Sequence, residues 1–446
     1  MILSLLLGCP AEDTGFPKPD WGTDTADTAE AGPLEVTLTG PAATLDECES
    51  ACFSVLTTRN GVPVNDVEVD VWSGDVVVGA DLRTRQKGEA GGCADGLTVG
   101  THTLTAIATL GTERATATAT AVVKPFGYAD GFNRSEAIVE EVPWTPTFER
   151  EPQNPVLPPG AADEWDAIGT IVPSVAPTRD GYVMWYAGTA EVDYILGAAT
   201  SPDGVAWTKD DDNPLLVPSE VEGDWRRYST NSPMVLAFEG TWYVYYTGRR
   251  EETSDLTIGL ATGSDPTEVT DVADNPVFSW DASEEDWAGQ AAAHPDVLIN
   301  DEGWWEMWYS TGYHKVGYAY SPDGRSWKRY CHNPVLVGDP DLDYEAHAIK
   351  ATEVVQLGDW YFTTYTAGAT GGFTVGWAMS RDGLHWAHGQ EPVLRAAEEP
   401  GTWESNSVLS APVLVVGDEL WMWYSGTGPT GSAVGLARAS LDGFPE

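Results

Sequence analysis

The sequence has few basic residues for its length. Its 446 residues include 23 Lys and Arg against 69 Asp and Glu, which gives a formal net charge of −46. Proteins that bind nucleic acids need Lys and Arg to neutralise phosphates, so we predict no nucleic-acid partner. The same balance argues against polyanionic substrates such as pectin or alginate. It is typical of a highly soluble protein in salty surroundings, or of an acidic pocket for cations or neutral sugars.

Long hydrophobic runs are also absent. No stretch of ~18 apolar residues occurs, so no transmembrane helix is predicted. The chain opens with the short run MILSLLLGC, which resembles a bacterial lipobox with Cys9 as the lipidated residue. Residues 1–9 are therefore interpreted as a short lipoprotein-type signal, and residues 10–33 as a disordered acidic tether. This predicts export and a lipid anchor at the cell envelope as the sole membrane contact; a plain disordered start is the alternative.

Cysteine is scarce, with five residues in the whole chain. Three of them, Cys48, Cys52 and Cys93, lie close together in the sequence. In an oxidising compartment we expect one disulfide from Cys93 to Cys48 or Cys52, and the spacing does not decide between them. Because no C-x-x-C pair exists, the sequence gives no indication of a structural zinc site.

Residues 34–124 read as short strands that alternate apolar and polar side chains, separated by turns with Gly, Asn or Asp. About 90 residues of such strands is the size of an immunoglobulin-like sandwich. We interpret this segment as an Ig-like spacer, with a carbohydrate-binding module as the alternative.

Residues 125–446 contain a repeat of about 60 residues. An NPVL-type tetrapeptide recurs with its prolines at Pro155, Pro214, Pro276, Pro334 and Pro392. Between these lie MWYxG-type strands and SPDG-type turns, so each repeat holds four short strands. Four strands a repeat is the pattern of a propeller blade.

The phase of the repeats indicates how the ring closes. The last repeat stops near Gly443 after its third strand, and the missing outer strand appears at residues 144–157. We therefore predict an all-β chain in which the Ig-like sandwich precedes a five-bladed β-propeller closed by an N-terminal outer strand.

The motifs MWYAG and LGAATSPDG resemble those of the five-bladed propellers of arabinanases, β-xylosidases, invertases and levansucrases, in glycoside hydrolase families 43, 32 and 68. The resemblance covers about 300 residues and implies a hydrolase with two carboxylates in a central funnel. In those enzymes the carboxylates lie on the first strand of a blade, one or two residues before a Pro-like position that follows an aromatic residue at a fixed distance. Here this position is taken by Pro173, Pro233, Pro295, Thr352 and Pro412. None of the matching residues here is acidic; the pairs are Ile171-Val172, Asn231-Ser232, Ala293-His294, Lys350-Ala351 and Ser410-Ala411.

Other carboxylates are close in sequence, and we expect Asp296, Glu353 and Glu404 to be the catalytic candidates. A structural hydrogen-bonding role is the alternative for Asp296. The candidates for substrate binding are Asp166, Trp165, Asn231, Trp287, His294, His347 and Lys350. The aromatic members belong to a column of Trp and Tyr that forms either sugar platforms or a ring of wedges between adjacent blades.

These observations predict a monomeric cell-surface glycoside hydrolase that acts on neutral glycans. The alternatives are a catalytically inactive carbohydrate-binding propeller and a protein-interaction propeller. The resemblance also implies a structural Ca²⁺ on the propeller axis as the one expected cofactor.

Overall fold

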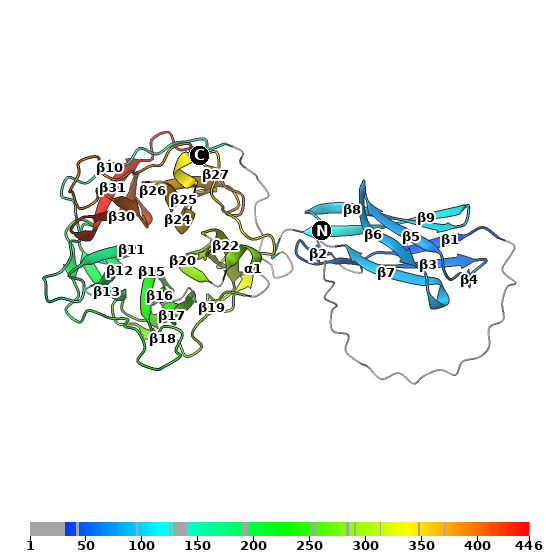
Figure 1. Ribbon diagram of the computed structural model, residues 1–446, viewed down its shortest axis with the longest axis horizontal. Helices are drawn as coiled ribbons and strands as arrows, with labels where there is room; N and C mark the ends of the chain where they lie inside the picture. Colours follow the sequence, from blue (N-terminus) through cyan, green and yellow to red (C-terminus); the bar gives the residue numbers. More distant parts are fainter. Residues whose placement is uncertain are drawn as a thin grey trace. The chain divides into compact units, whose positions relative to one another are not determined.

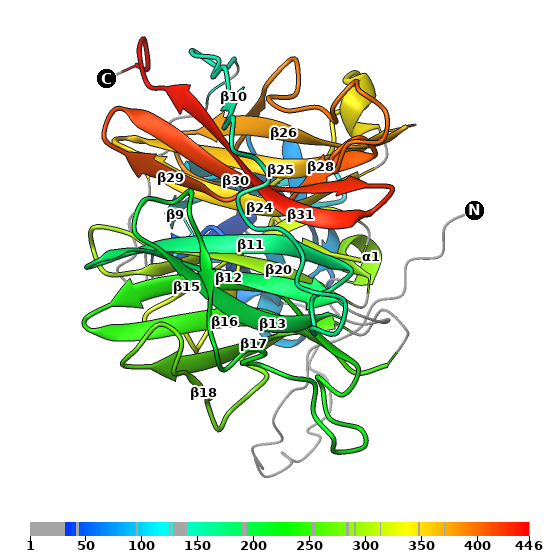
Figure 2. The ribbon, with the colours of Figure 1, turned by 90° about the vertical axis from the view of Figure 1, so that its left-hand side faces the viewer.

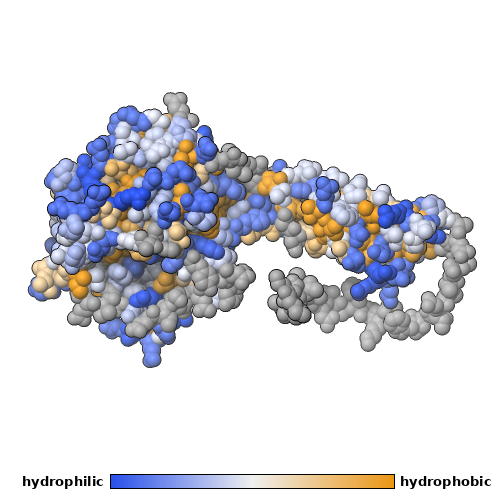
Figure 3. Space-filling model, turned by 45° about the horizontal axis from the view of Figure 1, so that its top comes forward, coloured by the Kyte–Doolittle hydropathy of each residue, from blue (hydrophilic) through white to orange (hydrophobic). Residues whose placement is uncertain are grey.

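The computed structural model describes residues 32–445 apart from 42–43, 95–96, 125, 128–138, 140, 190–193, 252–255, 282–284, 290, 313, 347 and 370. Cys9, His347 and most of the predicted tether lie outside the described residues. The chain divides into two compact units, Met1–Lys124 and Pro125–Glu446, and both are built from β-strands. No described helix is long and apolar enough to cross a membrane. Figure 3 shows hydrophilic residues over much of the visible surface, with smaller apolar patches between them.

The first unit holds two sheets around one core. One sheet contains β1 (Glu35–Thr39), β3 (Ala51–Arg59), β4 (Val62–Pro63) and β7 (Glu89–Ala94). The other runs in the order β2 (Leu45–Asp46), β9 (Glu113–Lys124), β8 (Gly100–Leu110), β5 (Glu68–Ser73) and β6 (Val76–Arg83). Buried and exposed residues alternate along β3, as expected for a strand with one face on a core. The core includes Phe53, Val55, Val69 and Leu104.

A disulfide joins Cys52 of β3 to Cys93 of β7. The two residues lie directly opposite each other on neighbouring antiparallel strands. The predicted bond to Cys93 is therefore confirmed, and the structure selects Cys52 from the two partners that the spacing left open.

The second unit contains five antiparallel meanders in its described residues, arranged in a ring in Figure 1. The first consists of β11 (Gly169–Thr178), β12 (Gly181–Thr189), β13 (Ile195–Ser201) and β14 (Thr208–Lys209). The second consists of β15 (Ser229–Phe238), β16 (Thr241–Arg249), β17 (Leu256–Gly263) and β18 (Thr270–Asp271), and β19 (Phe278–Ser279) also pairs with β17.

The third meander follows a short helix, α1 (Glu285–Ala288), and consists of β20 (Ala292–Ile299), β21 (Trp305–Thr311), β22 (Val316–Ser321) and β23 (Lys328–Arg329). The fourth consists of β24 (Ala348–Leu357), β25 (Trp360–Ala369), β26 (Gly372–Ser380) and β27 (Ala387–His388). The fifth consists of β28 (Ser407–Leu409), β29 (Val413–Val416), β30 (Glu419–Gly428) and β31 (Gly431–Ser440).

The outer strand of the fifth meander comes from the other end of the unit. Strand β10 (Glu149–Arg150) pairs antiparallel with β31, and the Asn154 side chain exchanges hydrogen bonds with the backbone of Leu436. This is the pairing that the phase of the repeats predicts. Figure 2 shows the consequence: β11 and β31, the first and last long strands of the unit, lie side by side.

Hydrogen bonds between successive meanders repeat around the ring. A side chain from the second strand of one meander donates to the carbonyl of a turn in the next, as in Trp185 Nε1 to Pro266 O (2.9 Å) and Trp308 Nε1 to Gly383 O (2.8 Å). Trp423 of the fifth meander donates in the same way to Gly204 O of the first, at 2.9 Å. The ends of the array are thus joined by the same contact as its interior, and these Trp side chains are fully buried.

A second hydrogen bond joins the fifth meander to the first: the Ser425 hydroxyl of β30 accepts the N–H of Val172 on β11, at 2.8 Å. We expect Ser425→Ala to lower the free energy of unfolding by about 1–3 kcal/mol, because it leaves a buried N–H without an acceptor. Thermal and urea unfolding would measure this. Thr427→Ala, two residues along the same strand, is the matched control, and equal stability of the two variants would contradict the role of this bond.

Candidate functional site

Four innermost strands contain one residue in the left-handed conformation, and in the fifth meander such a residue lies between β28 and β29. These residues have φ between 42° and 52° and lie at or beside a bulge; they are Val172, Ser232, His294, Ala351 and Ser410. Non-glycine residues adopt this conformation at a cost, so the surroundings must hold them there. A bulge also inserts one extra residue and resets which side chains face the centre of the ring.

Hydroxyl groups of the preceding meander hold four of these five residues. The acceptor is the Ser or Thr of the MWYxG-type motif, and it takes the N–H of the left-handed residue at 2.8–2.9 Å; the donor–acceptor pairs are Val172–Ser425, His294–Thr247, Ala351–Ser310 and Ser410–Thr366. The first meander has Ala187 at the motif position. The N–H of Ser232 is accepted instead by Oδ1 of its own neighbour Asn231, at 2.8 Å. The amide oxygen of Asn231, a predicted substrate contact, therefore supports the backbone.

The left-handed residues also correct the alignment of the fifth repeat. Leu409 lies opposite Ser425 as Ile171 lies opposite Ala187, and Ser410 has the positive φ. The pair that matches the other repeats is therefore Leu409-Ser410, one residue earlier than the predicted Ser410-Ala411. The Pro-like position then falls on Ala411, at the same distance from Trp403 as in the other repeats.

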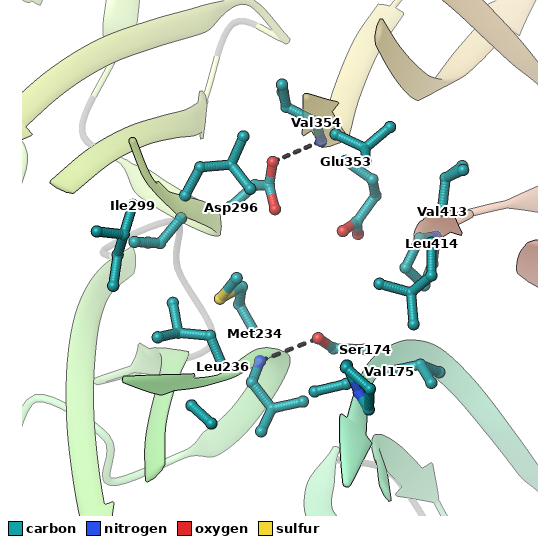
Figure 4. A pocket seen from close by; sticks show the side chains of 18 of the residues that line it. Ser174, Val175, Met234, Leu236, Asp296, Ile299, Glu353, Val354, Val413 and Leu414 are labelled. Atoms are coloured by element: carbon teal, nitrogen blue, oxygen red, sulfur yellow. Dashed lines mark hydrogen bonds between the residues drawn. The ribbon is translucent and has the colours of Figure 1, made fainter. Parts of the chain in front are cut away.

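The position two residues after each left-handed residue lines a central cavity of about 460 Å³. The five residues at this level are Ser174, Met234, Asp296, Glu353 and Pro412, and the rest of the lining is mainly Val, Leu, Ile and Ala. Alternation alone would turn a side chain shifted by one residue away from the centre. Because the bulge adds a residue, the carboxylates of Asp296 and Glu353 point into the cavity, toward each other (Figure 4).

Asp296 has one firm hydrogen-bond partner. Its Oδ2 accepts the N–H of Val354 on the neighbouring strand at 2.6 Å, and the side chain is buried. Ser174 makes the equivalent contact two meanders earlier, with its Oγ accepting the N–H of Val235 at 3.0 Å (Figure 4). The structural alternative for Asp296 is therefore observed, and its second oxygen remains directed at the cavity.

The two carboxylates differ in their electrostatic surroundings. Burial raises the pKa of Asp296, while the N–H groups of Val354 and Val297 partly oppose that shift. Burial also raises the pKa of Glu353, and the neighbouring charge of Asp296 raises it further. The arrangement therefore favours a protonated Glu353 beside an Asp296 that is easier to ionise.

A histidine and a lysine, His294 and Lys350, lie at the level of the left-handed residues. Nδ1 of His294 is 2.7 Å from Oγ of Ser232, and Nζ of Lys350 lies 4.7 Å from the centre of the Phe373 ring. Desolvation, followed by the charge of Lys350, lowers the pKa of His294 to about 3. Desolvation lowers the pKa of Lys350 as well. Sequence reasoning identified His294 and Lys350 but missed Ser232, whose only signal was its place beside Asn231 in the repeat alignment.

Glu404 does not reach the cavity. Both of its carboxylate oxygens lie 3.0–3.1 Å from Nε of Arg150, on the outer strand β10. The side chain is buried, and it also bonds the Tyr424 hydroxyl. The structure therefore corrects the catalytic prediction for Glu404, because its charge is already neutralised in an ion pair that holds the closing strand.

Asp166 belongs to the same kind of ion pair. Its Oδ2 accepts hydrogen bonds from Nζ of Lys209 (2.6 Å) and from the Tyr186 hydroxyl (3.0 Å), and it is completely buried. In the second meander the charges are exchanged: Arg226 stands at the position of Asp166 and pairs with Asp271 of the outer strand. A pair that tolerates reversal of its charges has a structural role, so Asp166 is not placed to bind substrate.

The side chains of the aromatic column pack inside their own meanders. Trp165 stacks on Tyr186 with ring centres 5.4 Å apart, and a Cβ at Gly188 or Gly197 would overlap its ring. Trp287 packs in the same way near Tyr309 and Gly317. These contacts use the rings of Trp165 and Trp287 in packing, which argues against the sugar platform. They lie within one meander, whereas the wedge alternative placed the rings between adjacent blades.

Metal ligands are not grouped in the part of the chain that the structure describes: it holds no cluster of three or more His, Cys, Asp or Glu side chains that could bind a metal ion. The axial Ca²⁺ that the resemblance implies stays a prediction.

Comparison with known proteins gives a remote likeness. No protein-family model matches the sequence. An uncharacterized protein of Mycobacterium tuberculosis, found in two strains, is 23% identical over 230 residues, which are 48% of this chain and 74% of that protein.

Solved structures resemble the fold more extensively. A structure from the GH130 family of mannoside phosphorylases covers 67% of this chain and 96% of its own, with a TM-score of 0.54 and 16% identity. A β-1,2-mannobiose phosphorylase of Listeria innocua, in complex with β-1,2-mannobiose, covers 66% and 97% with a TM-score of 0.53 and 15% identity. A glycosyl hydrolase of Bacteroides ovatus covers 67% and 96%, with a TM-score of 0.53 and 16% identity. The chain therefore has a fold that carbohydrate-active enzymes share.

The raised pKa values of Asp296 and Glu353 predict a dependence of stability on pH. The unfolded chain releases these protons near the ordinary carboxyl pKa of about 4, whereas the folded chain retains them to higher pH. The free energy of unfolding should therefore fall as the pH rises from about 4 to neutral. Asp296→Asn and Glu353→Gln should each reduce this fall, measured as melting temperature against pH. Glu391→Gln removes an exposed carboxylate as the control; parallel profiles for all variants would contradict the assignment.

Proposed function

We propose that the second unit is a five-bladed β-propeller that acts on neutral glycans as a glycoside hydrolase, with Asp296 and Glu353 as its reacting carboxylates. The meanders are its blades, and residues 144–157 supply the outer strand of the fifth. Residues 34–124 form an Ig-like spacer, and the protein acts as a monomer. The observation that carries the proposal is the pair of carboxyl groups that face each other in the central cavity (Figure 4).

Glycoside hydrolysis needs one protonated carboxyl group and one carboxylate. Glu353, whose pKa is raised by burial and by Asp296, is suited to protonate the leaving oxygen. Asp296 keeps an N–H donor from Val354, which stabilises its ionised form for attack or for activating water. The two residues come from adjacent inner strands. The bulges of these strands therefore suffice to bring both carboxyl groups into the cavity.

The test is hydrolysis of a panel of aryl glycosides by Asp296→Asn and Glu353→Gln. We expect each variant to lose about 10²–10⁴-fold in kcat on any substrate that wild type cleaves, since general acid–base catalysis contributes that much. Glu391→Gln should retain wild-type turnover. Wild-type turnover in both cavity variants would show that the reacting groups lie elsewhere.

A second candidate is a catalytically inactive propeller that binds carbohydrate. The observation that favours it is the cavity lining, which apart from Ser174, Asp296, Glu353 and Asn300 consists of apolar residues. Glycan-array binding without hydrolysis of any glycoside, retained in Asp296→Asn, would favour this candidate over the enzyme.

We further propose that Cys9 anchors the exported protein to the cell envelope. The support is the sequence LLGC followed by a tether rich in Asp, Thr and Pro. Growth with a fatty-acid analogue should label the wild-type protein, and Cys9→Ser should abolish the label. Equal labelling of both forms would contradict the anchor.

A further inference from the structure

Three side chains that carry or can accept positive charge gather where the inner strands of the third and fourth meanders begin. They are His294, Lys350 and His314. Desolvation, followed by the charge of Lys350, lowers the pKa of both imidazoles. The chain carries three times as many acidic residues as basic ones. Even so, no carboxylate in the described part of the chain forms an ion pair with Lys350 or His294.

The nearby carboxylates face the central cavity. Asp296 accepts a backbone N–H, and the carboxyl group of Glu353 points toward Asp296, as Figure 4 shows. Desolvating a cation without a partner is costly, so a lysine held in this way is poised for an ion that arrives with the ligand. The ammonium group rests over the Phe373 ring, which supports it without neutralising it.

We propose that Lys350, His294 and Ser232 bind one anionic group of the ligand, a carboxylate or a phosphate. Lys350 supplies the charge. Ser232 and the neutral imidazole share a hydrogen bond of 2.7 Å, so together they supply one directional donor, either the Ser232 hydroxyl or Nε2–H of His294 according to the tautomer. Asn231 precedes Ser232, and because its Oδ1 accepts the N–H of Ser232, its Nδ2 group is the part of the side chain left to donate. The site shares two strands with the carboxylates: His294 lies two residues before Asp296 on β20, and Lys350 three residues before Glu353 on β24.

The proposal deepens the proposed function by adding one anionic group to an otherwise neutral glycan. A net charge of −46 disfavours the approach of polyanions. At physiological ionic strength, however, dissolved ions largely screen charges that lie more than about 8 Å away. Inside the ring, the nearest charges therefore decide which ligand binds. A single acidic group is attracted by Lys350, whereas a chain of them would meet the acidic surface.

The experiment is calorimetric titration of the full chain with inorganic phosphate, glucuronate and glucose. We expect an anion to bind and glucose alone to bind more weakly; binding of phosphate only or of glucuronate only identifies the source of the group. Lys350→Met should weaken anion binding by about ten- to a hundred-fold, as expected for a charged hydrogen bond. Lys350→Arg should restore most of it.

Lys328→Met is the matched control, because Lys328 also lies over an aromatic ring, 5.7 Å from the centre of Phe126, but is exposed. Melting temperatures of all variants would separate lost binding from lost folding. His294→Asn should weaken anion binding without abolishing it. Failure of both anions to bind, or unchanged binding in a folded Lys350→Met, would overturn the proposal. Anion binding without hydrolysis would leave it standing while the hydrolase proposal fails.

Discussion

The left-handed residue of each meander is the constraint on which the centre of this protein depends. Its conformation is unfavourable for a side chain, so a hydroxyl from the preceding meander, or Asn231 in one case, must accept its N–H. In four of the repeats that contact joins neighbouring meanders, and in all five it holds the residue at the bulge. The bulge in turn decides that Asp296 and Glu353 face inward. Packing between repeats and the chemistry of the cavity therefore share one cause.

The all-β class and the origin of the closing strand could be predicted from sequence, because each repeat contains four short strands and the phase of the repeats shows which strand is missing at the end. The NPVL asparagines mark a strand end, and their phase places Asn154 beside Leu436 although 282 residues separate them. The disulfide was predictable only to two alternatives. Its choice depends on which cysteine lies opposite Cys93 across the sheet, and strand register cannot be read from spacing.

The candidate site was predictable in part. Asp296 and Glu353 were identified from their place after the repeated Pro-like residue, but simple alternation turned them outward and only the bulge brings them in. Glu404 and Asp166 were misread because the sequence does not show Arg150 or Lys209 on the outer strand beside them. The signal that could have found the bulges was present: the last variable position of the MWYxG-type motif is Ser or Thr in four of the five repeats.

The pairing of β10 with β31 has a consequence for how the chain is made. During synthesis, Arg150 emerges long before its partners Ala437 and Glu404 exist. It must wait with open backbone groups while four meanders assemble, and contacts so distant in sequence form slowly. The ring therefore matures in one late step, and until then the nascent protein exposes a free edge that another copy could occupy.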